Sequence, residues 1–206
     1  LLRKDGATGV DKVDFKSYEE NLSENISNLV ERLKRKSYKA KLIKRTYIPK
    51  GEGKTRPLGI PTLEDKLLQR AVARILNAIW EPQFLPYSFG YRPNLSAKSA
   101  VKYLSGEIQG GRFGWVIDAD IEGFFDNINH EKMIGMLEHK IDDGALVRLI
   151  KKWLKAGILE PDGKVIHPAT GTPQGGIVSP VLANIYLHYV RDLWYACCLL
   201  WIFCVD

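Results

Sequence analysis

The 206-residue sequence predicts a fold of the α+β class, and three observations point to it. Stretches with helical periodicity and stretches with strand-like runs both occur along the chain. They do not follow one another in the strict β-α alternation that produces a parallel sheet. Hydrophobic residues make up 45% of the chain, which is enough to form a packed core.

The N-terminal part of the chain predicts a helix followed by a strand hairpin. Ser17 to Glu20 has the form of a capping box, which indicates a helix start. Residues 41–61 contain two short β-prone runs on either side of Gly51 and Gly53, the pattern of a hairpin with a cationic tip. The apolar residues at helical spacing after the capping box are Leu22, Ile26, Leu29, Val30 and Leu33.

Helices dominate the rest of the predicted fold. Thr62 can cap a helix that Pro82 ends, and one face of it carries Leu63, Leu67, Ala71, Ile75 and Ile79. The remaining expected elements are a helix over 96–108, a strand over 116–121, helices over 131–141 and 145–156, a hairpin around 161–163, and a long helix after the glycine-rich turn at 171–176.

Positive charge is concentrated near the predicted hairpin. The net charge is +6, which suits a polyanionic partner. Between Arg32 and Arg56 the only acid is Glu52, so a solvated helix face and a nucleic-acid surface are both open readings. The basic residues of this segment are Arg32, Lys34, Arg35, Lys36, Lys39, Lys41, Lys44, Arg45, Lys50, Lys54 and Arg56.

The cysteines and the longest apolar run indicate a cytoplasmic protein with no membrane partner. Cys197, Cys198 and Cys204 lack metal-ligand spacing, and nothing suggests disulfide bridges, so a reducing compartment is expected. The apolar run from Leu193 to Val205 is shorter than the roughly 20 residues that a membrane span needs.

Acidic residues stand at the end of the predicted strand over 116–121. Because side chains alternate in a strand, Asp118 and Asp120 share one face. Carboxylates beside a core are costly unless they are paired or neutralised, so they favour a hard cation, with a strand end that merely reaches solvent as the alternative. Two-metal phosphoryl transfer would need a second acidic strand, for which the late candidate is Asp206.

Four stretches in order carry a family resemblance: "YIPKGEGKTRPLGIPTLEDKLLQ", "PYSFGYRP", "VIDADIEGFFDNINH" and "GTPQGGIVSPVLANIYLHYV". Together they resemble the reverse transcriptase domain of group II intron-encoded proteins, the intron maturases. The resemblance implies the fingers and palm of a reverse transcriptase, with a small antiparallel palm sheet backed by helices. It places 1–112 mainly in the fingers and 113–206 mainly in the palm, truncated in the second catalytic strand, with no thumb, maturase or endonuclease domain.

The resemblance also implies a metal site. Asp120 and Asp206 take the positions of the catalytic acids that bind Mg²⁺, with Mn²⁺ as the alternative ion, and the backbone carbonyl of Ile121 assists. Cys204 stands where the family has a tyrosine before the second acid. Phe125 matches the residue under the incoming sugar, whereas Phe124, of opposite strand parity, is expected to pack in the core.

Further residues take nucleotide and nucleic-acid roles by the same resemblance. Lys50 and Arg56 match the pair that grips the triphosphate, and Arg suits it because its guanidinium can bind phosphate with two parallel hydrogen bonds. Gln174 and Gly175 match residues that line the nucleotide and template side of the pocket. The expected nucleic-acid contacts are Lys44, Arg45, Lys54 and Arg92, with Tyr38 and Tyr47 as weaker candidates for stacking.

The function implied is RNA-directed DNA polymerisation, in which a primer 3′-hydroxyl attacks the α-phosphate of a deoxynucleoside triphosphate. The partners implied are an RNA template, a DNA primer, the deoxynucleoside triphosphate and the intron RNA. Because the match stops at Asp206, within the second catalytic strand, the activity of this chain stays open. A non-catalytic intron RNA-binding splicing module and a decayed remnant are the alternatives. The sequence does not indicate an oligomeric state.

Overall fold

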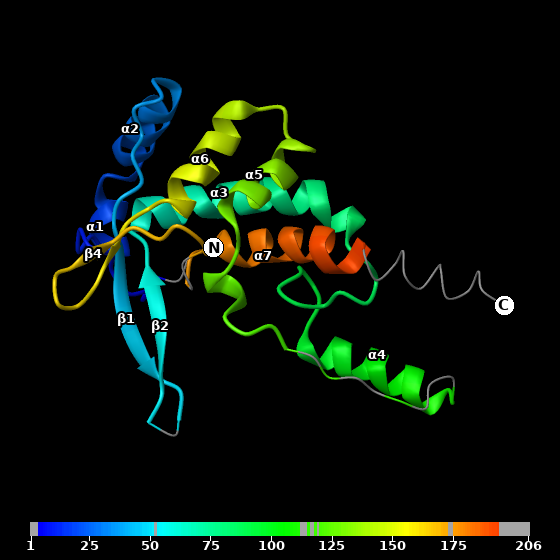
Figure 1. The fold of residues 1–206 in the computed structure, drawn as a ribbon. Helices are drawn as coiled ribbons and strands as arrows, with labels where there is room; N and C mark the ends of the chain where they lie inside the picture. Colours follow the sequence, from blue (N-terminus) through cyan, green and yellow to red (C-terminus); the bar gives the residue numbers. More distant parts are fainter. Residues whose placement is uncertain are drawn as a thin grey trace.

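The computed structural model describes residues 4–51, 53–111, 115, 118, 120–172 and 175–193. Separate helices and one sheet make up this part of the chain, which confirms the α+β class (Figure 1). In chain order the elements are α1 (Phe15–Glu20), α2 (Leu22–Lys34), β1 (Ile43–Pro49), β2 (Thr55–Ile60), α3 (Leu63–Trp80), a 3-10 turn (Glu81–Gln83), α4 (Ala97–Gln109), a 3-10 turn (Phe124–Asp126), α5 (His130–Glu138), α6 (Gly144–Leu154), β3 (Ile158–Leu159), β4 (Val165–Ile166), α7 (Ser179–Leu187) and a π-helical turn (His188–Asp192).

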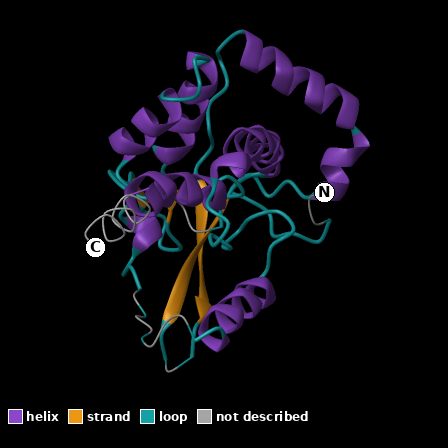
Figure 2. Ribbon diagram, turned by 90° about the vertical axis from the view of Figure 1, so that its right-hand side faces the viewer, coloured by secondary structure: helices purple, strands orange, loops and turns teal. Residues whose placement is uncertain are grey.

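The sheet has the strand order β2-β1-β3-β4. β1 and β2 form the expected antiparallel hairpin, in a register that pairs Lys44 with Ile60 and Pro49 with Thr55. β3 runs parallel to the start of β1 and returns as β4, which confirms the second hairpin. Most helices gather around one end of the long hairpin (Figure 2), and its tip extends away from them in Figure 1. The tip of β1 and β2 is therefore accessible to a partner.

The main core lies among α3, α5, α6 and α7. Its largest fully buried side chains include Trp80, Met133, Ile150 and Leu182. A capping hydrogen bond from the Asp65 amide to the Thr62 hydroxyl begins α3, as the sequence predicts. These helices thus form one packed body, from which the hairpin and the connecting turns extend.

The buried face of α3 differs from the predicted one. Ile75 is 47% exposed and Ala71 is also exposed, whereas Val72, Leu76 and Trp80 are buried. Apolar residues occur on two neighbouring stripes of this helix, so periodicity alone does not decide between them. The stripe that ends in the bulky Trp80 is the one that packs against the other helices.

The N-terminal helices also differ from prediction in detail. The carboxylate of Asp14, not Ser17, caps α1, and the helix breaks at Asn21. On α2 only Leu29 is buried, while Leu22 and Val30 are 46% and 41% exposed. This pair of helices lies at the edge of the molecule in Figure 1, which leaves part of its apolar stripe uncovered. In the part of the chain that the structure describes, no helix combines the length and apolarity needed to cross a membrane.

The strand expected over 116–121 is not found at its described residues. Asp118, Asp120 and Ile121 belong to no strand, and all three are exposed. Alternation of apolar and acidic residues gives a strand only when another strand pairs with it, and the described sheet does not extend to this stretch. Asp120 therefore lies in an irregular segment just before a turn, outside the described sheet.

Tyr38, a weaker candidate for nucleic-acid stacking, lies inside the protein instead. It is 1% exposed, its hydroxyl donates to the Asp65 carboxylate, and it accepts a hydrogen bond of 3.0 Å from Trp153 Nε1. Burial raises the pKa of Tyr38, and the negative charge of Asp65 raises it further. The stacking prediction for Tyr38 is therefore wrong, because its ring and hydroxyl are both used in the core.

The buried Tyr38 hydroxyl predicts a loss of stability at high pH. An unfolded tyrosine ionises near pH 10, whereas the raised pKa keeps Tyr38 protonated in the folded chain. The contribution of protonated Tyr38 to the free energy of unfolding is therefore complete below about pH 10. Above that pH it falls by at most about 1.4 kcal/mol per pH unit. Urea unfolding of the wild type and Tyr38→Phe between pH 8.5 and 11 should show a shallower decline in the variant. Equal slopes would contradict this assignment.

A candidate active-site cleft

A cleft of about 540 Å³ lies between the hairpin tip, the turn after Asp120 and the end of α7. Five residues that the sequence assigns to metal or nucleotide binding line it together: Lys50, Arg56, Asp120, Ile121 and Phe125. The other lining residues are Thr55, Pro57, Gly123, Phe124, Leu187 and Arg191. Segments about seventy residues apart in the chain therefore converge on one space.

The cationic wall of the cleft is formed by a tight hairpin tip. Gly51 and Gly53 both have positive φ angles, of 83° and 72°, which glycine adopts without strain. The Lys50 amide donates to the Lys54 carbonyl at 2.8 Å and closes the turn. This turn brings Lys50 at the end of β1 and Arg56 at the start of β2 to the same cleft. Two positive charges therefore face the space that a ligand would occupy.

Another part of the cleft lining carries the Asp120 carboxylate and the backbone of Ile121. Both residues are exposed. Within the described residues, the Asp120 carboxylate makes no hydrogen bond or ion pair. Carboxylate and backbone carbonyl oxygens are ligands that Mg²⁺ prefers, so these two residues fit one side of a divalent-ion site. No group of three or more His, Cys, Asp or Glu residues that could hold a metal occurs among the residues described, and Asp206 lies outside them.

Phe125 lies in the 3-10 turn that forms the floor of the cleft. Gly123 precedes this turn with φ of 58°. The ring of Phe125 lies edge-on to the rings of Phe124 and Tyr91, with centroid distances of 5.6 Å and 6.3 Å. Phe124 packs against the core, as expected, but it also lines the cleft. Strand parity does not separate the two rings here, because the residues are in a helical turn.

The turn that carries Phe125 is fixed by the start of the glycine-rich turn at 171–176. The Thr172 amide donates to the Phe125 carbonyl at 2.7 Å, and the Gly171 amide donates to Ile128 at 2.7 Å. Gly171 approaches so closely that a Cβ there would lie 2.7 Å from the Asp126 carbonyl oxygen. The loop and the aromatic turn are therefore a single backbone unit, and Gly171 is required for their contact.

Gly175 and Gln174 lie in the next part of this loop. Gly175 has φ of 106°, and a Cβ on it would lie 2.5 Å from the Gly59 carbonyl oxygen in β2. Gly175 does not line the cleft, so its described contact is with the hairpin. Gln174 lies outside the described residues. The structure thus gives Gly175 a packing reason that the sequence did not indicate.

Two of the predicted nucleic-acid contacts are engaged inside the protein. The Arg92 side chain is 10% exposed, pairs with Glu81 at 2.9 Å and donates to two backbone carbonyls. The Arg45 side chain is 15% exposed and pairs with Glu160 at 3.2 Å. Both guanidinium groups therefore have internal partners, which removes the basis for expecting them to contact phosphate.

The other two predicted nucleic-acid contacts remain on the surface. Lys44 lines a second groove, of about 500 Å³, between β1, the N-terminal loop and the turn between β3 and β4. Lys54 is exposed at the hairpin tip, next to the cleft. Tyr47 is 47% exposed and its hydroxyl donates to Glu160 at 2.9 Å. Lys44 and Tyr47 thus face the second groove, whereas Lys54 lies at the tip of the hairpin.

Arg191 is a residue of the cleft that the sequence analysis missed. It lies in the π-helical turn after α7, lines the cleft, and pairs with the buried Asp192 at 2.5 Å. It is the single lysine or arginine after Lys164 in the sequence, at the start of a largely apolar and aromatic segment. A lone arginine in such a segment was the signal that could have identified it.

Comparison with known proteins gives a consistent result. The model of the reverse transcriptase (RNA-dependent DNA polymerase) family matches residues 48–205. The group II intron-encoded protein LtrA of Lactococcus lactis subsp. cremoris is 47% identical over 166 residues, which cover 80% of this chain and 27% of that protein. The protein YkfC of Escherichia coli is 35% identical over 186 residues, 87% of this chain and 48% of that protein. The chain therefore spans between about a quarter and a half of these relatives.

A solved structure has the same fold. A chain of a partial Cas6-RT-Cas1–Cas2 complex superimposes with a TM-score of 0.57 at 27% sequence identity. The match covers 93% of this chain and 32% of that chain. The fold similarity thus includes both the hairpin and the helical body.

Proposed function

The chain belongs to the reverse transcriptase (RNA-dependent DNA polymerase) family and is homologous to its group II intron-encoded members, and on that premise we propose that the cleft binds a deoxynucleoside triphosphate for RNA-templated DNA synthesis. One observation carries the proposal: Lys50, Arg56, Asp120, Ile121 and Phe125 line the same space. A cationic wall opposite a carboxylate suits a ligand that carries phosphates and a divalent cation together.

The hairpin tip is proposed to hold the triphosphate. Lys50 supplies a compact ammonium, and Arg56 can form paired hydrogen bonds to two phosphate oxygens. Arg191 also lines the cleft, but its guanidinium pairs with the buried Asp192, so the hairpin cations Lys50 and Arg56 are the proposed phosphate contacts. These groups would orient the triphosphate and offset its negative charge before and during the reaction.

Reverse transcriptases use divalent metal ions, and we propose Mg²⁺, with Mn²⁺ as the alternative. The Asp120 carboxylate and the Ile121 carbonyl would hold it, and Asp206 is the proposed second acid. When bound, such an ion supplies positive charge that favours attack of the primer 3′-hydroxyl on the α-phosphate. Phe125 would place its ring under the sugar, where a bulky apolar group opposes a 2′-hydroxyl.

The nucleic-acid partners are proposed to lie along the hairpin and the glycine-rich turn at 171–176. Lys54 and Lys44 are the proposed backbone contacts, and Gln174 and Gly175 are proposed to border the template side of the nucleotide. An RNA template, a DNA primer and the intron RNA are the proposed partners. Arg45 and Arg92 are left out because their guanidinium groups have internal partners.

The proposed division of the chain follows the cleft. Residues 1–112 are assigned mainly to the fingers and 113–206 mainly to the palm, so that the hairpin cations and the Asp120 turn come from different parts. The proposed location is the cytoplasm, because the cysteine pattern fits a reducing compartment.

Primer extension by the chain tests this proposal. A DNA primer annealed to an RNA template should be extended by the purified chain in the presence of Mg²⁺ and not in the presence of excess chelator. RNA binding that is undiminished by the chelator, with no nucleotide added under any condition, would instead favour the non-catalytic RNA-binding reading. The two outcomes are distinguished on the same sample by resolving product length and bound RNA.

A further inference from the structure

Helix α3 carries two buried polar side chains on one face, Asp65 and Gln69. They are 3% and 4% exposed, and they are one helical turn apart. A buried polar group destabilises a fold unless it is hydrogen-bonded. Burial raises the pKa of Asp65, against the hydrogen bonds that favour its charged form. Each of these residues therefore occupies a position where an apolar residue would be the simpler choice for the core.

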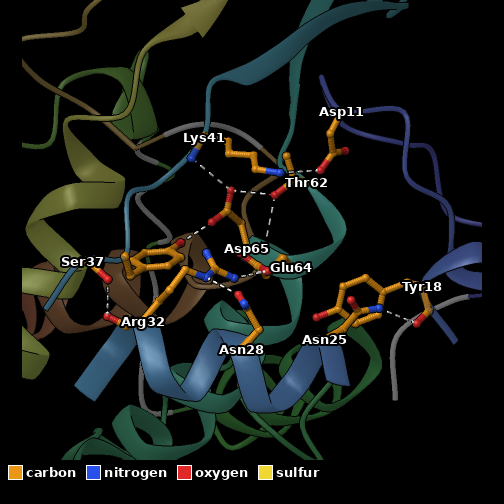
Figure 3. A network of polar contacts seen from close by, with 11 residues as sticks. Asp11, Tyr18, Asn25, Asn28, Arg32, Ser37, Lys41, Thr62, Glu64 and Asp65 are labelled. Carbon is orange, nitrogen blue, oxygen red and sulfur yellow. Dashed lines mark hydrogen bonds and ion pairs between the residues drawn. The ribbon is translucent and has the colours of Figure 1, made fainter. Parts of the chain in front are cut away.

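Asp65 joins the two roots of the β1–β2 hairpin. Its carboxylate accepts a hydrogen bond of 2.8 Å from the Thr62 hydroxyl, just after β2. It also accepts one of 3.4 Å from the Lys41 amide, just before β1, as Figure 3 shows. The Tyr38 hydroxyl donates to the same carboxylate. One side chain thus fixes where the hairpin leaves and re-enters the helical body.

The Asp65 cluster is anchored in the main core through Tyr38. Trp153 Nε1 on α6 donates to the Tyr38 hydroxyl at 3.0 Å, and Lys152 Nζ donates to the Tyr38 carbonyl at 2.6 Å. Trp153 is itself 4% exposed. The hairpin roots are therefore tied to α6 as well as to α3.

Gln69 ties the glycine-rich turn to the same helix. Its side-chain carbonyl accepts a hydrogen bond of 2.9 Å from the Ile177 amide. Two residues earlier in the chain, Gly175 packs against the backbone of β2 at Gly59. The turn therefore sits between α3 and the hairpin, and it supports β2 from the side.

A small rotation at the hairpin root would move its tip considerably. Lys50 lies six residues beyond Lys44, a distance of about 20 Å in a strand. A rotation of about 5° at the root would displace the tip by about 2 Å over that length. Displacements of about 1 Å in a positioned group can change rates about a hundredfold. The hydrogen bonds at the root therefore control where the cations of the cleft lie.

We propose that Asp65 and Gln69 are positioning residues that set the hairpin over the cleft, so that Lys50 and Arg56 reach a bound triphosphate. This inference rests on the proposed function for the ligand, but its structural part concerns the hairpin alone. Neither residue lines the cleft, so both act through the elements that they hold.

Two variants remove one tie each without changing side-chain size greatly. Tyr38→Phe deletes the hydroxyl that donates to Asp65, and Gln69→Met deletes the acceptor for the Ile177 amide. Gln69→Glu is the matched variant, because it keeps an acceptor oxygen at the same position. Ile150→Val, in a fully buried position of α6, controls for a general loss of core packing.

Hydrogen exchange of the full chain tests, without any ligand, whether Asp65 and Gln69 hold the hairpin and the glycine-rich turn in place. Tyr38→Phe should accelerate exchange over 43–49 and 55–60, and Gln69→Met over 175–179, while 130–138 keeps its protection relative to the wild type. Gln69→Glu should retain the protection that Gln69→Met loses. Uniform acceleration over all segments, as Ile150→Val would give, or no change over the hairpin and turn, would overturn the proposal.

Triphosphate binding tests whether the position of the hairpin determines how well Lys50 and Arg56 hold the ligand. In Tyr38→Phe the dissociation constant of a Mg²⁺–deoxynucleoside triphosphate should rise about tenfold. In a background that already carries Lys50→Ala and Arg56→Ala, Tyr38→Phe should add no further change, because the two cations through which it acts are gone. An equal additional loss in that background would contradict positioning. If the wild type binds no triphosphate, the proposed function fails, and hydrogen exchange alone decides whether Asp65 and Gln69 hold these elements.

Discussion

Asp120→Asn is expected to reduce Mg²⁺-dependent primer extension about a thousandfold or more. The substitution keeps the size of the side chain and removes its negative charge, so a divalent ion loses a ligand that is worth several kcal/mol in the transition state. Because Asp120 is exposed and makes no internal contact among the described residues, the fold should be unaffected. Single-turnover extension at saturating nucleotide measures the effect.

Asp118→Asn is the matched control for this prediction. Asp118 is also exposed and lies two residues earlier, but it does not line the cleft. Its variant should extend primers at close to the wild-type rate and should unfold at the same temperature as Asp120→Asn. Extension at the wild-type rate by Asp120→Asn, with or without an effect at Asp118, would remove Asp120 from the metal site.

Lys50→Ala combined with Arg56→Ala is expected to weaken triphosphate binding about a hundredfold. A hydrogen bond to a charged group contributes about 1.5–3 kcal/mol, and the exposure of both side chains puts the expected value at the lower end. Screening by salt should reduce the difference between variant and wild type, because the interaction is ionic. Titration with a fluorescent deoxynucleoside triphosphate at two salt concentrations measures both effects.

The double variant Lys132→Ala and Lys155→Ala controls for the loss of two positive charges. Both lysines are exposed, and neither lines the cleft. It should bind the triphosphate within about twofold of the wild type, because exposed charges that do not touch the ligand are screened by salt. Equal losses in both double variants would mean that net charge, and not the hairpin tip, determines affinity.

Local sequence signals predicted the hairpin tip and the cap of α3. The glycines at 51 and 53 predicted the tight tip, and Thr62 predicted the start of α3, because both act within a few residues. The family resemblance predicted Lys50, Arg56 and Asp120 as parts of one site, and all three line the same cleft. The turn and cap signals depend only on neighbours in the chain, so they can be interpreted without knowledge of the tertiary structure.

The roles of single charged and aromatic residues were predicted less well. Arg45 pairs with Glu160, Tyr38 with Asp65, and neither partner is near it in sequence. A basic or aromatic residue in a basic segment is predicted to contact nucleic acid at the surface as long as its distant partner inside the protein is unknown. The same limit concealed Arg191, whose place in the cleft depends on how the turn after α7 meets the hairpin.

Helix faces were the other source of error. On α3 two apolar stripes competed, and the packing partners α5, α6 and α7 selected the one with Leu76 and Trp80. On α2 the apolar stripe exists, but no element of the described chain covers Leu22 and Val30. Periodicity identifies a helix reliably, whereas the choice of its buried face depends on the elements that pack against it.

The most direct test of the account is a crystal structure of the chain with Mn²⁺ and a deoxynucleoside triphosphate, in which anomalous scattering locates the ion. The account predicts Mn²⁺ in contact with the Asp120 carboxylate and the Ile121 carbonyl, and phosphate oxygens within hydrogen-bonding distance of Lys50 and Arg56. Ion and nucleotide bound together elsewhere, such as in the groove beside Lys44, would contradict the central claim that this cleft is the nucleotide site.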